Sequence, residues 1–405
     1  MSLSIQRPRV ALIGVSGYGR IYYEFLKEFH LAGLIELAAA VVIDAEREKL
    51  KVAELAALGC RIYGDFLEML AQEAGRLDLC GVPTGTPWHA PMTLAALEGG
   101  ANVLVEKPLA ATVAEVRAIQ AAEAKTGRTV LVGFQYLYQK ENRDLQRALA
   151  QGAIGMVRRV RVLGLWPRGS DYYTRNNWAG RILSAGAPVF DSPVSNAFAH
   201  QLSLALFFAG NEPGRSASPV RVSSELYRAQ PIENYDTAVL RIETDTGASV
   251  HFYASHSVET TFDPEIVIEG SNGRAVWRHL RDYRLEANGR PAQAIPLGRE
   301  EGPRRAMFEQ VMGWFSNPSL PYCGSATALE HTRCVEAAQA SGAITDVPAG
   351  FLTDNGEAGE GRFVWIRDLE ALMQRAFADG SSLTEAGCPW SRPPVTMTVS
   401  GLPGA

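Results

Sequence analysis

The feature that most constrains the fold is an alternation of short apolar runs with helical patterns through the first third of the chain. Six runs are typical of buried strands, at residues 10–13, 37–43, 61–63, 77–82, 103–105 and 129–134. Repeated strand–helix–strand units need crossover connections, so neighbouring strands lie parallel with helices on both faces of the sheet. The sequence therefore predicts a doubly wound α/β domain that binds its ligands at the carboxyl ends of the strands.

The pattern changes after about residue 135, and we expect a first domain at 1–135 and a second at 136–405. A helix at 142–150 and a strand at 157–163 are followed by consecutive strands between 220 and 285. Turns at Asp245-Thr-Gly247, Asn272-Gly273 and Asn288-Gly289 predict hairpins and hence an antiparallel sheet, the last two turns of type I′. Helices are expected at 305–315, 326–341 and 363–378, and a Pro/Gly-rich tail at 388–405 is expected to be a surface strap or partly disordered.

Charge and cysteine content favour a small-molecule partner. The chain of 405 residues has 39 Lys+Arg against 44 Asp+Glu, a net charge of −5 without long runs of either sign, which gives no support to nucleic acid or an anionic membrane as partner. No cleavable signal or membrane-length apolar stretch is evident. Five widely spaced cysteines show no metal-ligand spacing, so no metal is expected and a reducing cytoplasm fits best.

A glycine-rich turn joins the first predicted strand to the first helix: Gly14-Val-Ser16-Gly17-Tyr18-Gly19, followed by Arg20. Glycines let the backbone approach a pyrophosphate, whose charge then meets N–H groups at a helix N-terminus. The spacing is GxxGxG, not the commoner GxGxxG, so a purely structural turn stays open as an alternative.

Asp44 follows the second predicted strand, near the position where a carboxylate binds the adenosine ribose hydroxyls. It favours NAD over NADP because it would repel a 2′-phosphate, although Arg47 could soften the discrimination. The alternative is that Asp44 only caps the next helix, and the two roles can coexist.

Three more motifs follow later strands: Pro83-Thr84-Gly-Thr86-Pro-Trp-His89, Glu106-Lys107-Pro108 and Gly133-Phe-Gln135. With the glycine turn and Gly152-Ala-Ile-Gly155, they resemble the Gfo/Idh/MocA oxidoreductases over most of the chain, up to about residue 380. The resemblance implies a Rossmann domain, a C-terminal α/β domain with a large open, mostly antiparallel sheet that forms a homodimer or homotetramer interface, and a nicotinamide in the cleft between the domains. The cofactor-binding residues it implies are Gly14, Ser16, Gly17, Tyr18, Gly19, Arg20, Asp44, Pro83, Thr84, Thr86, His89, Glu106, Lys107 and Gln135.

Lys107 resembles the family lysine that hydrogen-bonds the reacting oxygen of the substrate, with a cis bond expected into Pro108. An ammonium there can stabilise negative charge during hydride transfer; the alternative is a surface lysine in a turn. Asn196 and His200 align with the family's Asp-x-x-x-His element, expected on one helix, with His200 as acid/base. Asn196 departs from the family because an amide orients the ring but brings no charge. Asp191 is a nearby carboxylate that could compensate.

A loop rich in aromatic side chains and hydrogen-bond donors runs from Trp166 to Gly180, and Arg175 and Trp178 are expected substrate contacts together with Lys107, Asn196 and His200. Aromatic faces and donors of this kind suit sugars, although interdomain packing explains the aromatics equally well. His251 and His256 receive no role.

The resemblance favours an NAD(H)-dependent oxidoreductase, acting on the CH–OH group of a sugar, cyclitol or related polyol. Two alternatives stay open: an enzyme with tightly bound NAD that oxidises a sugar transiently, and a non-catalytic dinucleotide or sugar sensor. The retained Lys107 and His200 argue against the sensor. The sequence leaves open the substrate, the reaction direction, the order of the oligomer, cofactor release at each turnover and the effect of Asn196 on catalysis.

Overall fold

The computed structural model describes residues 7–287, 292–299, 301–342, 344–358 and 361–405. The chain divides into two compact units. Unit 1 comprises residues 1–110, 114–138 and 303–328, and unit 2 comprises 111–113, 139–302 and 329–405. The sequence-based division was placed near residue 135; the chain enters unit 2 briefly at 111–113 and again after 138, and residues 303–328 return to unit 1.

Unit 1 is built on a six-stranded sheet in the order β3-β2-β1-β4-β5-β6, all of whose pairings are parallel. The strands are β1 (Arg9–Ile13), β2 (Glu36–Val41), β3 (Arg61–Tyr63), β4 (Leu79–Val82), β5 (Asn102–Val105) and β6 (Val130–Val132). The connecting helices are α1 (Gly19–Leu31), α2 (Lys49–Ala57), α3 (Phe66–Gln72), α4 (Thr86–Glu98) and α5 (Val113–Thr126). The predicted doubly wound sheet is confirmed.

Helix α9 (Glu301–Trp314) contributes to the core of unit 1 from far along the sequence. Its Phe308 is fully buried, makes an edge contact with Tyr22 at 4.9 Å between ring centroids, and stacks on Phe25 at 4.6 Å. The helix is further joined to α1 by Arg305, which forms a two-pronged ion pair with Glu28. Residues 303–328 are therefore an integral part of unit 1.

Unit 2 contains a mixed sheet of ten described strands, in the order β16-β15-β14-β13-β7-β12-β11-β10-β17, with β20 also paired to β10. The strands are β7 (Val157–Leu165), β10 (Pro219–Arg228), β11 (Thr237–Thr244), β12 (Ser249–Ser255), β13 (Phe262–Gly270), β14 (Gly273–Arg278), β15 (Asp282–Ala287), β16 (Gln293–Pro296), β17 (Thr345–Asp346) and β20 (Val395–Thr398). Only the β7–β12 and β10–β17 pairs among them are parallel. The large, mostly antiparallel sheet is thus confirmed.

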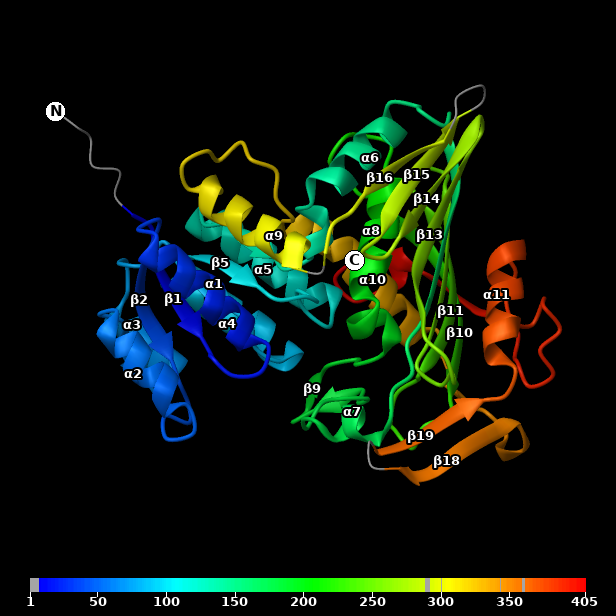
Figure 1. Ribbon diagram of the computed structural model, residues 1–405, viewed down its shortest axis with the longest axis horizontal. Coiled ribbons are helices and arrows are strands. Elements are labelled where there is room, and N and C mark those ends of the chain that lie inside the picture. The colour runs from blue at the N-terminus through cyan, green and yellow to red at the C-terminus, as the bar shows by residue number, and fades with distance from the viewer. Residues whose placement is uncertain (1–6, 288–291, 300, 343, 359–360) are drawn as a thin grey trace. The chain divides into compact units, whose positions relative to one another are not determined.

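Helices lie on both faces of this sheet, with α8 (Ala199–Ala209) on one side and α11 (Leu369–Asp379) on the other (Figure 1). Alternate residues of β7 serve the two faces: Gly164 lies against Phe198, whereas Leu163 and Leu165 join the apolar cluster that contains α11. That cluster extends into the C-terminal tail through Trp390, whose ring meets that of Tyr227 edge-on.

The remaining helices and short strands of unit 2 complete this unit. They are α6 (Lys140–Ala150), α7 (Ser170–Thr174), β8 (Leu183–Ser184), β9 (Ala187–Pro188), the β18 (Leu352–Ala358) and β19 (Gly361–Ile366) hairpin, and α10 (Ser325–Ala340), which begins in unit 1. In unit 2, short 3₁₀ segments occur at η3 (Ala349–Phe351) and η4 (Val399–Gly401), and the π-helical segment η2 (Pro193–Ala197) precedes α8; a further 3₁₀ segment, η1 (Gln135–Leu137), follows β6 in unit 1.

Three expectations for unit 2 were wrong in detail. The predicted helix at 363–378 is strand β19 followed by the shorter helix α11; of the two alternatives for the tail, a surface strap or partial disorder, the second is wrong, because the tail forms strand β20 on the sheet. The hairpin at Asn272-Gly273 exists but is not of type I′, because neither residue has a positive φ. Gly273 is needed for another reason, since a Cβ there would lie 2.3 Å from the Glu286 carbonyl oxygen. The predicted turn at Asn288-Gly289 lies outside the described residues.

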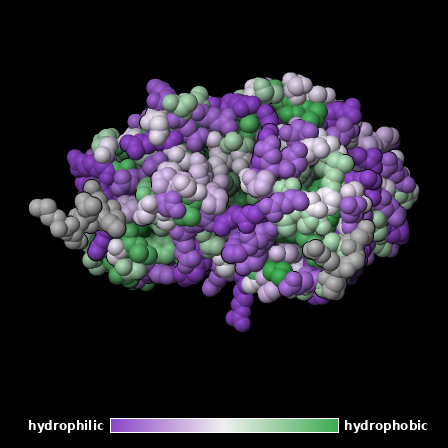
Figure 2. Space-filling view, turned by 90° about the horizontal axis from the view of Figure 1, so that it is seen from above, coloured by the Kyte–Doolittle hydropathy of each residue, from purple (hydrophilic) through white to green (hydrophobic). Residues whose placement is uncertain are grey.

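Hydrophilic residues predominate on the face of the molecule seen in Figure 2, interrupted by smaller apolar patches. None of the helices in the described part of the chain is long and apolar enough to cross a membrane.

Candidate active site

The glycine turn connects β1 to α1. Gly14 and Gly17 both have positive φ, at 94° and 55°, which side-chain-bearing residues adopt rarely. At Gly19, the first residue of α1, a Cβ would lie 2.4 Å from the Gly14 carbonyl oxygen. Ser16, Gly17, Tyr18 and Arg20 are exposed around this turn. The tight turn that the motif predicted is present, and it leaves the start of α1 accessible.

Two carboxylates lie beyond the end of β2, close to the glycine turn. Strand β2 ends at Val41, earlier than predicted, and Asp44 occupies an exposed turn where its Oδ1 accepts the Arg47 backbone N–H at 3.0 Å. The alternative that Asp44 caps the next helix is wrong, because α2 begins at Lys49 with Glu48 at its N-cap; Asp44 instead caps the turn before it. Glu48, which the sequence analysis did not single out, accepts a 2.7 Å hydrogen bond from the Ser16 hydroxyl and so connects this turn to the glycine turn.

The Pro83–His89 motif follows β4 and opens α4. Thr84 lies at the strand end and its hydroxyl is buried, whereas Pro83 and Thr86 are buried within the turn. His89 has its Nδ1 2.6 Å from the Pro108 carbonyl oxygen and its Nε2 2.9 Å from that of Thr84. Burial, with a smaller effect of Lys107, lowers the pKa of His89, and the hydrogen bonds to the two carbonyl oxygens oppose this. Its nitrogens are thus directed at backbone groups, and it positions the strand ends.

The Glu106-Lys107-Pro108 motif follows β5, and the expected cis bond between Lys107 and Pro108 is confirmed. Glu106 is buried, and its Oε1 accepts a 2.9 Å hydrogen bond from the Tyr22 hydroxyl. Burial raises the pKa of Glu106, opposed by the positive charges of Lys107 and Arg304. Gly133, at the end of β6, leaves room for this carboxylate, because a Cβ there would lie 2.7 Å from Glu106 Oε1.

Unit 1 therefore gathers the predicted motifs at the carboxyl ends of β1, β2, β4, β5 and β6. These residues fit a dinucleotide on structural grounds. No side chain caps the start of α1, and the buried Thr84 Oγ1 and Gln135 Oε1 have no hydrogen-bond partner in the described part of the chain. A pyrophosphate suits the uncapped helix start, and the two oxygens can meet donors or acceptors of a ligand.

In unit 2, Asn196 and His200 are not on one continuous helix as expected. Asn196 lies in the π-helical segment η2 and His200 in α8, with Phe198 breaking the regular pattern between them. Asn196 Nδ2 donates a 2.8 Å hydrogen bond to Asp191 Oδ1, and the other oxygen of Asp191 accepts the Gly180 N–H at 2.7 Å. A buried carboxylate thus contacts Asn196, five residues before the position of the family aspartate.

The aromatic loop of unit 2 is organised around the guanidinium groups of two arginines. Arg175 lies 3.6 Å from the ring centroid of Tyr172 and 5.3 Å from that of Trp178. Arg168 lies 5.1 Å from the Tyr172 centroid. Arg175 is exposed and Trp178 half-buried, so both predicted substrate contacts are presented by this loop.

His256, to which the sequence analysis gave no role, is a further candidate site residue. Its ring packs against Phe198 and Tyr172, its Nδ1 lies 2.8 Å from the Trp166 carbonyl oxygen, and its buried Nε2 has no partner in the described residues. Burial lowers its pKa to about 3, so the ring is neutral and Nε2 is an acceptor if Nδ1 donates to Trp166. The sequence signal was weak because histidines on sheet strands are usually structural.

Comparison with known proteins agrees with this division. Residues 9–134 match the family described as the oxidoreductase family with an NAD-binding Rossmann fold, and residues 142–276 match the GFO/IDH/MocA C-terminal domain. The D-apiose dehydrogenase of Paraburkholderia graminis is 26% identical over 384 residues, which is 91% of this chain and 92% of that protein. An inositol 2-dehydrogenase/D-chiro-inositol 3-dehydrogenase of Shouchella clausii is 25% identical, covering 71% of this chain and 77% of its own length.

Among solved structures, the WlbA dehydrogenase of Bordetella pertussis, in complex with NADH and UDP-GlcNAcA, has a TM-score of 0.69 at 18% identity. The match covers 85% of this chain and 99% of that one, and it supports the fold. Both family regions and the arrangement of strands and motifs agree, so the chain belongs to the Gfo/Idh/MocA family of NAD-dependent oxidoreductases.

Proposed function

We propose that this protein transfers hydride between NAD(H) and a CH–OH carbon of a sugar, cyclitol or related polyol. The observation that carries the proposal is Lys107, placed at the carboxyl end of β5 beside the buried Glu106, in the same unit as the glycine turn. The aromatic loop with its arginines supports a polyhydroxylated substrate, as do the names of the apiose and inositol dehydrogenases to which the chain is similar.

The roles follow from the chemistry of each side chain. A bound nicotinamide supplies or accepts the hydride. The Lys107 ammonium hydrogen-bonds the reacting oxygen and stabilises the negative charge that develops on it. The imidazole of His200 exchanges the proton of the reacting hydroxyl group. Asn196, four residues earlier and hydrogen-bonded to Asp191, orients the imidazole ring. Arg175 and Trp178 contact the substrate.

Asp44 supports NAD rather than NADP as the working cofactor. Its Oδ1 is engaged by the Arg47 N–H, yet the side chain is exposed and Glu48 brings a second carboxylate to the same turn. A 2′-phosphate would meet the negative charge of Asp44, whereas ribose hydroxyls can donate hydrogen bonds to a carboxylate; the charge of Glu48 is already paired with Lys51.

The test follows nicotinamide absorbance with NAD, then NADP, against pooled cyclitols, aldoses, sugar acids and polyols. We expect NAD reduction with wild type and at least a hundredfold slower turnover with Lys107→Met, at nearly unchanged NAD affinity. Equal turnover in the variant would remove Lys107 from the reaction. NAD binding without turnover on any pool would favour the bound-cofactor enzyme or the sensor.

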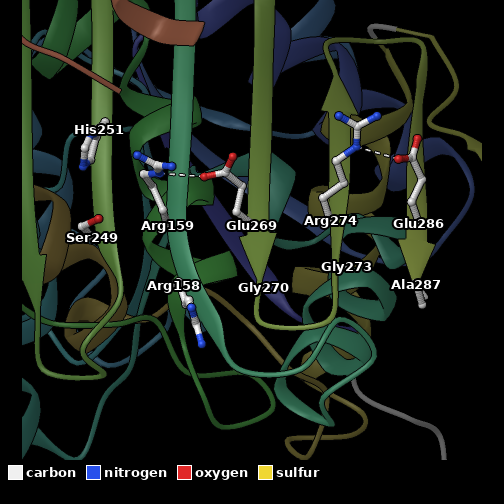
Figure 3. Close-up of a pocket in the computed structure, with 10 residues that line it drawn as sticks. All are labelled: Arg158, Arg159, Ser249, His251, Glu269, Gly270, Gly273, Arg274, Glu286 and Ala287. Atoms are coloured by element: carbon white, nitrogen blue, oxygen red, sulfur yellow. Dashed lines mark hydrogen bonds and ion pairs between the residues drawn. The ribbon is translucent and has the colours of Figure 1, made fainter. Parts of the chain in front are cut away.

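We propose that the face of the unit 2 sheet that carries α11 is the homodimer interface. Because α11 covers part of this face, only the part beyond the helix is open to a second copy. Beyond the end of that helix lies an open hollow of about 850 Å³ (Figure 3). Across it, one row of residues in register on β7, β13, β14 and β15 alternates in charge: Arg159, Glu269, Arg274 and Glu286. Arg159 pairs with Glu269 and Arg274 with Glu286, each at 2.6 Å.

A row of alternating sign is complementary to itself after a two-fold rotation about its centre, since every arginine then faces a glutamate of the second copy. Glu269→Arg should therefore shift the protein toward monomer in sedimentation velocity, more at low salt than at high salt. Glu212→Arg, in an exposed pair with Arg215 elsewhere in unit 2, is the matched charge reversal and should leave the assembly unchanged. A dimer unaffected by Glu269→Arg would place the interface elsewhere.

A further inference from the structure

Arg304 contacts the glycine turn from a distant part of the chain. It lies in the first turn of α9 and its side chain hydrogen-bonds Tyr18, the residue between Gly17 and Gly19. Its charge also acts on Glu106. Arg304, Tyr18 and Glu106 all belong to unit 1, so this contact lies within one compact body.

The neighbours of Arg304 on α9 pack against α1. Phe308, four residues later and hence on the same face of the helix, is buried against Tyr22 and Phe25 of α1. Arg305 points to another part of α1, where it pairs with Glu28 and lies 5.2 Å from the Phe25 ring centroid. Two adjacent arginines are thus directed at different places, and only Arg304 is directed at the glycine turn.

The start of α1 is where a pyrophosphate meets a Rossmann domain. The same region already contains the buried carboxyl group of Glu106, and the carboxylates of Asp44 and Glu48 lie beyond the end of the neighbouring strand β2. A doubly charged pyrophosphate beside these carboxyl groups is stabilised by nearby cations, and Lys107 and Arg304 are the two whose charge acts on Glu106. A guanidinium carries five N–H donors and can hold several acceptors at once, phosphate oxygens among them.

We propose that Arg304 is a cofactor-binding residue that contacts the pyrophosphate of NAD while it hydrogen-bonds Tyr18. This inference rests on the dinucleotide binding that the proposed function also needs, but not on the identity of the substrate. It assigns a binding role to the segment that returns to unit 1, which none of the strand-end motifs contains.

The test is the affinity for NAD⁺, ADP-ribose and adenosine, measured by calorimetry without substrate. Arg304→Gln should weaken NAD⁺ and ADP-ribose roughly 10- to 100-fold, the loss expected for a charge-assisted hydrogen bond, and adenosine by less than about twofold. Arg304→Lys keeps the positive charge, so its affinities for NAD⁺ and ADP-ribose should lie between those of wild type and Arg304→Gln. Arg305→Gln is the matched control, because it removes the same charge one residue away, and it should bind all three ligands like wild type.

The outcomes separate the alternatives. Equal NAD⁺ affinity in wild type and Arg304→Gln would overturn the proposal, leaving Arg304 a structural partner of Tyr18. A loss for NAD⁺ but not for ADP-ribose would also overturn it, since Arg304 would then act at the nicotinamide. If thermal unfolding shows that Arg304→Gln is poorly folded, the NAD⁺ affinity of Arg304→Lys decides the question. As a second measurement, the NAD⁺ affinity of wild type should fall more steeply with rising salt concentration than that of Arg304→Gln. If the Arg304 variants lose affinity for NAD⁺ and ADP-ribose as expected but the wild-type protein turns over no substrate, only the proposed function is refuted.

Discussion

Asn196→Asp would restore the residue type that the family uses, yet the structure predicts that it destabilises unit 2. Asn196 Nδ2 lies 2.8 Å from Asp191 Oδ1, and the Asp191 side chain is buried at 3% exposure. Two carboxylates at this separation repel by about 6 kcal/mol at an effective dielectric constant of about 20. The pair avoids that repulsion by retaining one proton, which costs about 4 kcal/mol at pH 7 for a carboxyl with an ordinary pKa near 4.

Retaining a proton costs less than the repulsion between two charged carboxylates, so the pair stays singly protonated at pH 7. We therefore expect Asn196→Asp to lower the free energy of unfolding by about 4 kcal/mol at pH 7. Its pH dependence has a definite sign. In the variant, the folded-state pKa of the pair is raised above the unfolded value. The loss is therefore absent below about pH 4 and grows by about 1.4 kcal/mol per pH unit until it levels off near pH 8.

Urea unfolding of wild type and variant between about pH 5 and pH 8 measures this difference directly. The exchange variant with Asp191→Asn and Asn196→Asp is the control, because it again pairs one carboxylate with one amide. The free energy of unfolding of this exchange variant should lie within about 1 kcal/mol of the wild-type value. A loss for Asn196→Asp that is the same at both ends of the pH range would refute the reasoning, because repulsion between two carboxylates must titrate.

Three other substitutions test separate parts of the molecule. Asp44→Ser should narrow the ratio of NAD to NADP affinities by roughly tenfold in fluorescence titrations, and an unchanged ratio would leave Asp44 only as a cap of its turn. His200→Asn should flatten the pH–rate profile of turnover, whereas a profile like that of wild type would assign the proton transfer to another group. Trp390→Ala should lower stability by about 3–5 kcal/mol in urea unfolding, because this side chain is only 7% exposed within the cluster under α11; a loss below about 1 kcal/mol would mean that the tail contributes little to the core.

The sequence predicted unit 1 well because its signals are local. Each buried strand is a short apolar run, and each motif directly follows a strand, so parallel topology alone brings Gly14, Pro83, Lys107 and Gln135 to one edge of the sheet. Neither long-range pairing nor knowledge of side-chain contacts was needed. The same reasoning could not find Arg304, because no local pattern tells that α9 packs on α1 almost 300 residues away in sequence.

Predictions for unit 2 were less accurate where tertiary contacts override local preference. Residues 361–366 join a hairpin with β18 although they precede a helix directly, and periodicity merged the two into one helix. Phe198, at the break between Asn196 and His200, is buried against Gly164 of β7, and no local pattern indicates this contact between distant positions. Asp191 was noticed as a nearby carboxylate, but only the structure shows that it holds Asn196.

The path of the chain between the two units limits how its parts can be exchanged. A fragment ending at Tyr138 contains all six strands of the first sheet but lacks α9, and it would expose the faces of Tyr22 and Phe25 that Phe308 covers. A single cut therefore yields no autonomous cofactor module. Recombination with a relative, in the laboratory or in evolution, preserves this core only if residues 303–328 are inherited together with the N-terminal part. The two separate stretches must co-evolve as one piece, whatever substrate the intervening sequence comes to recognise.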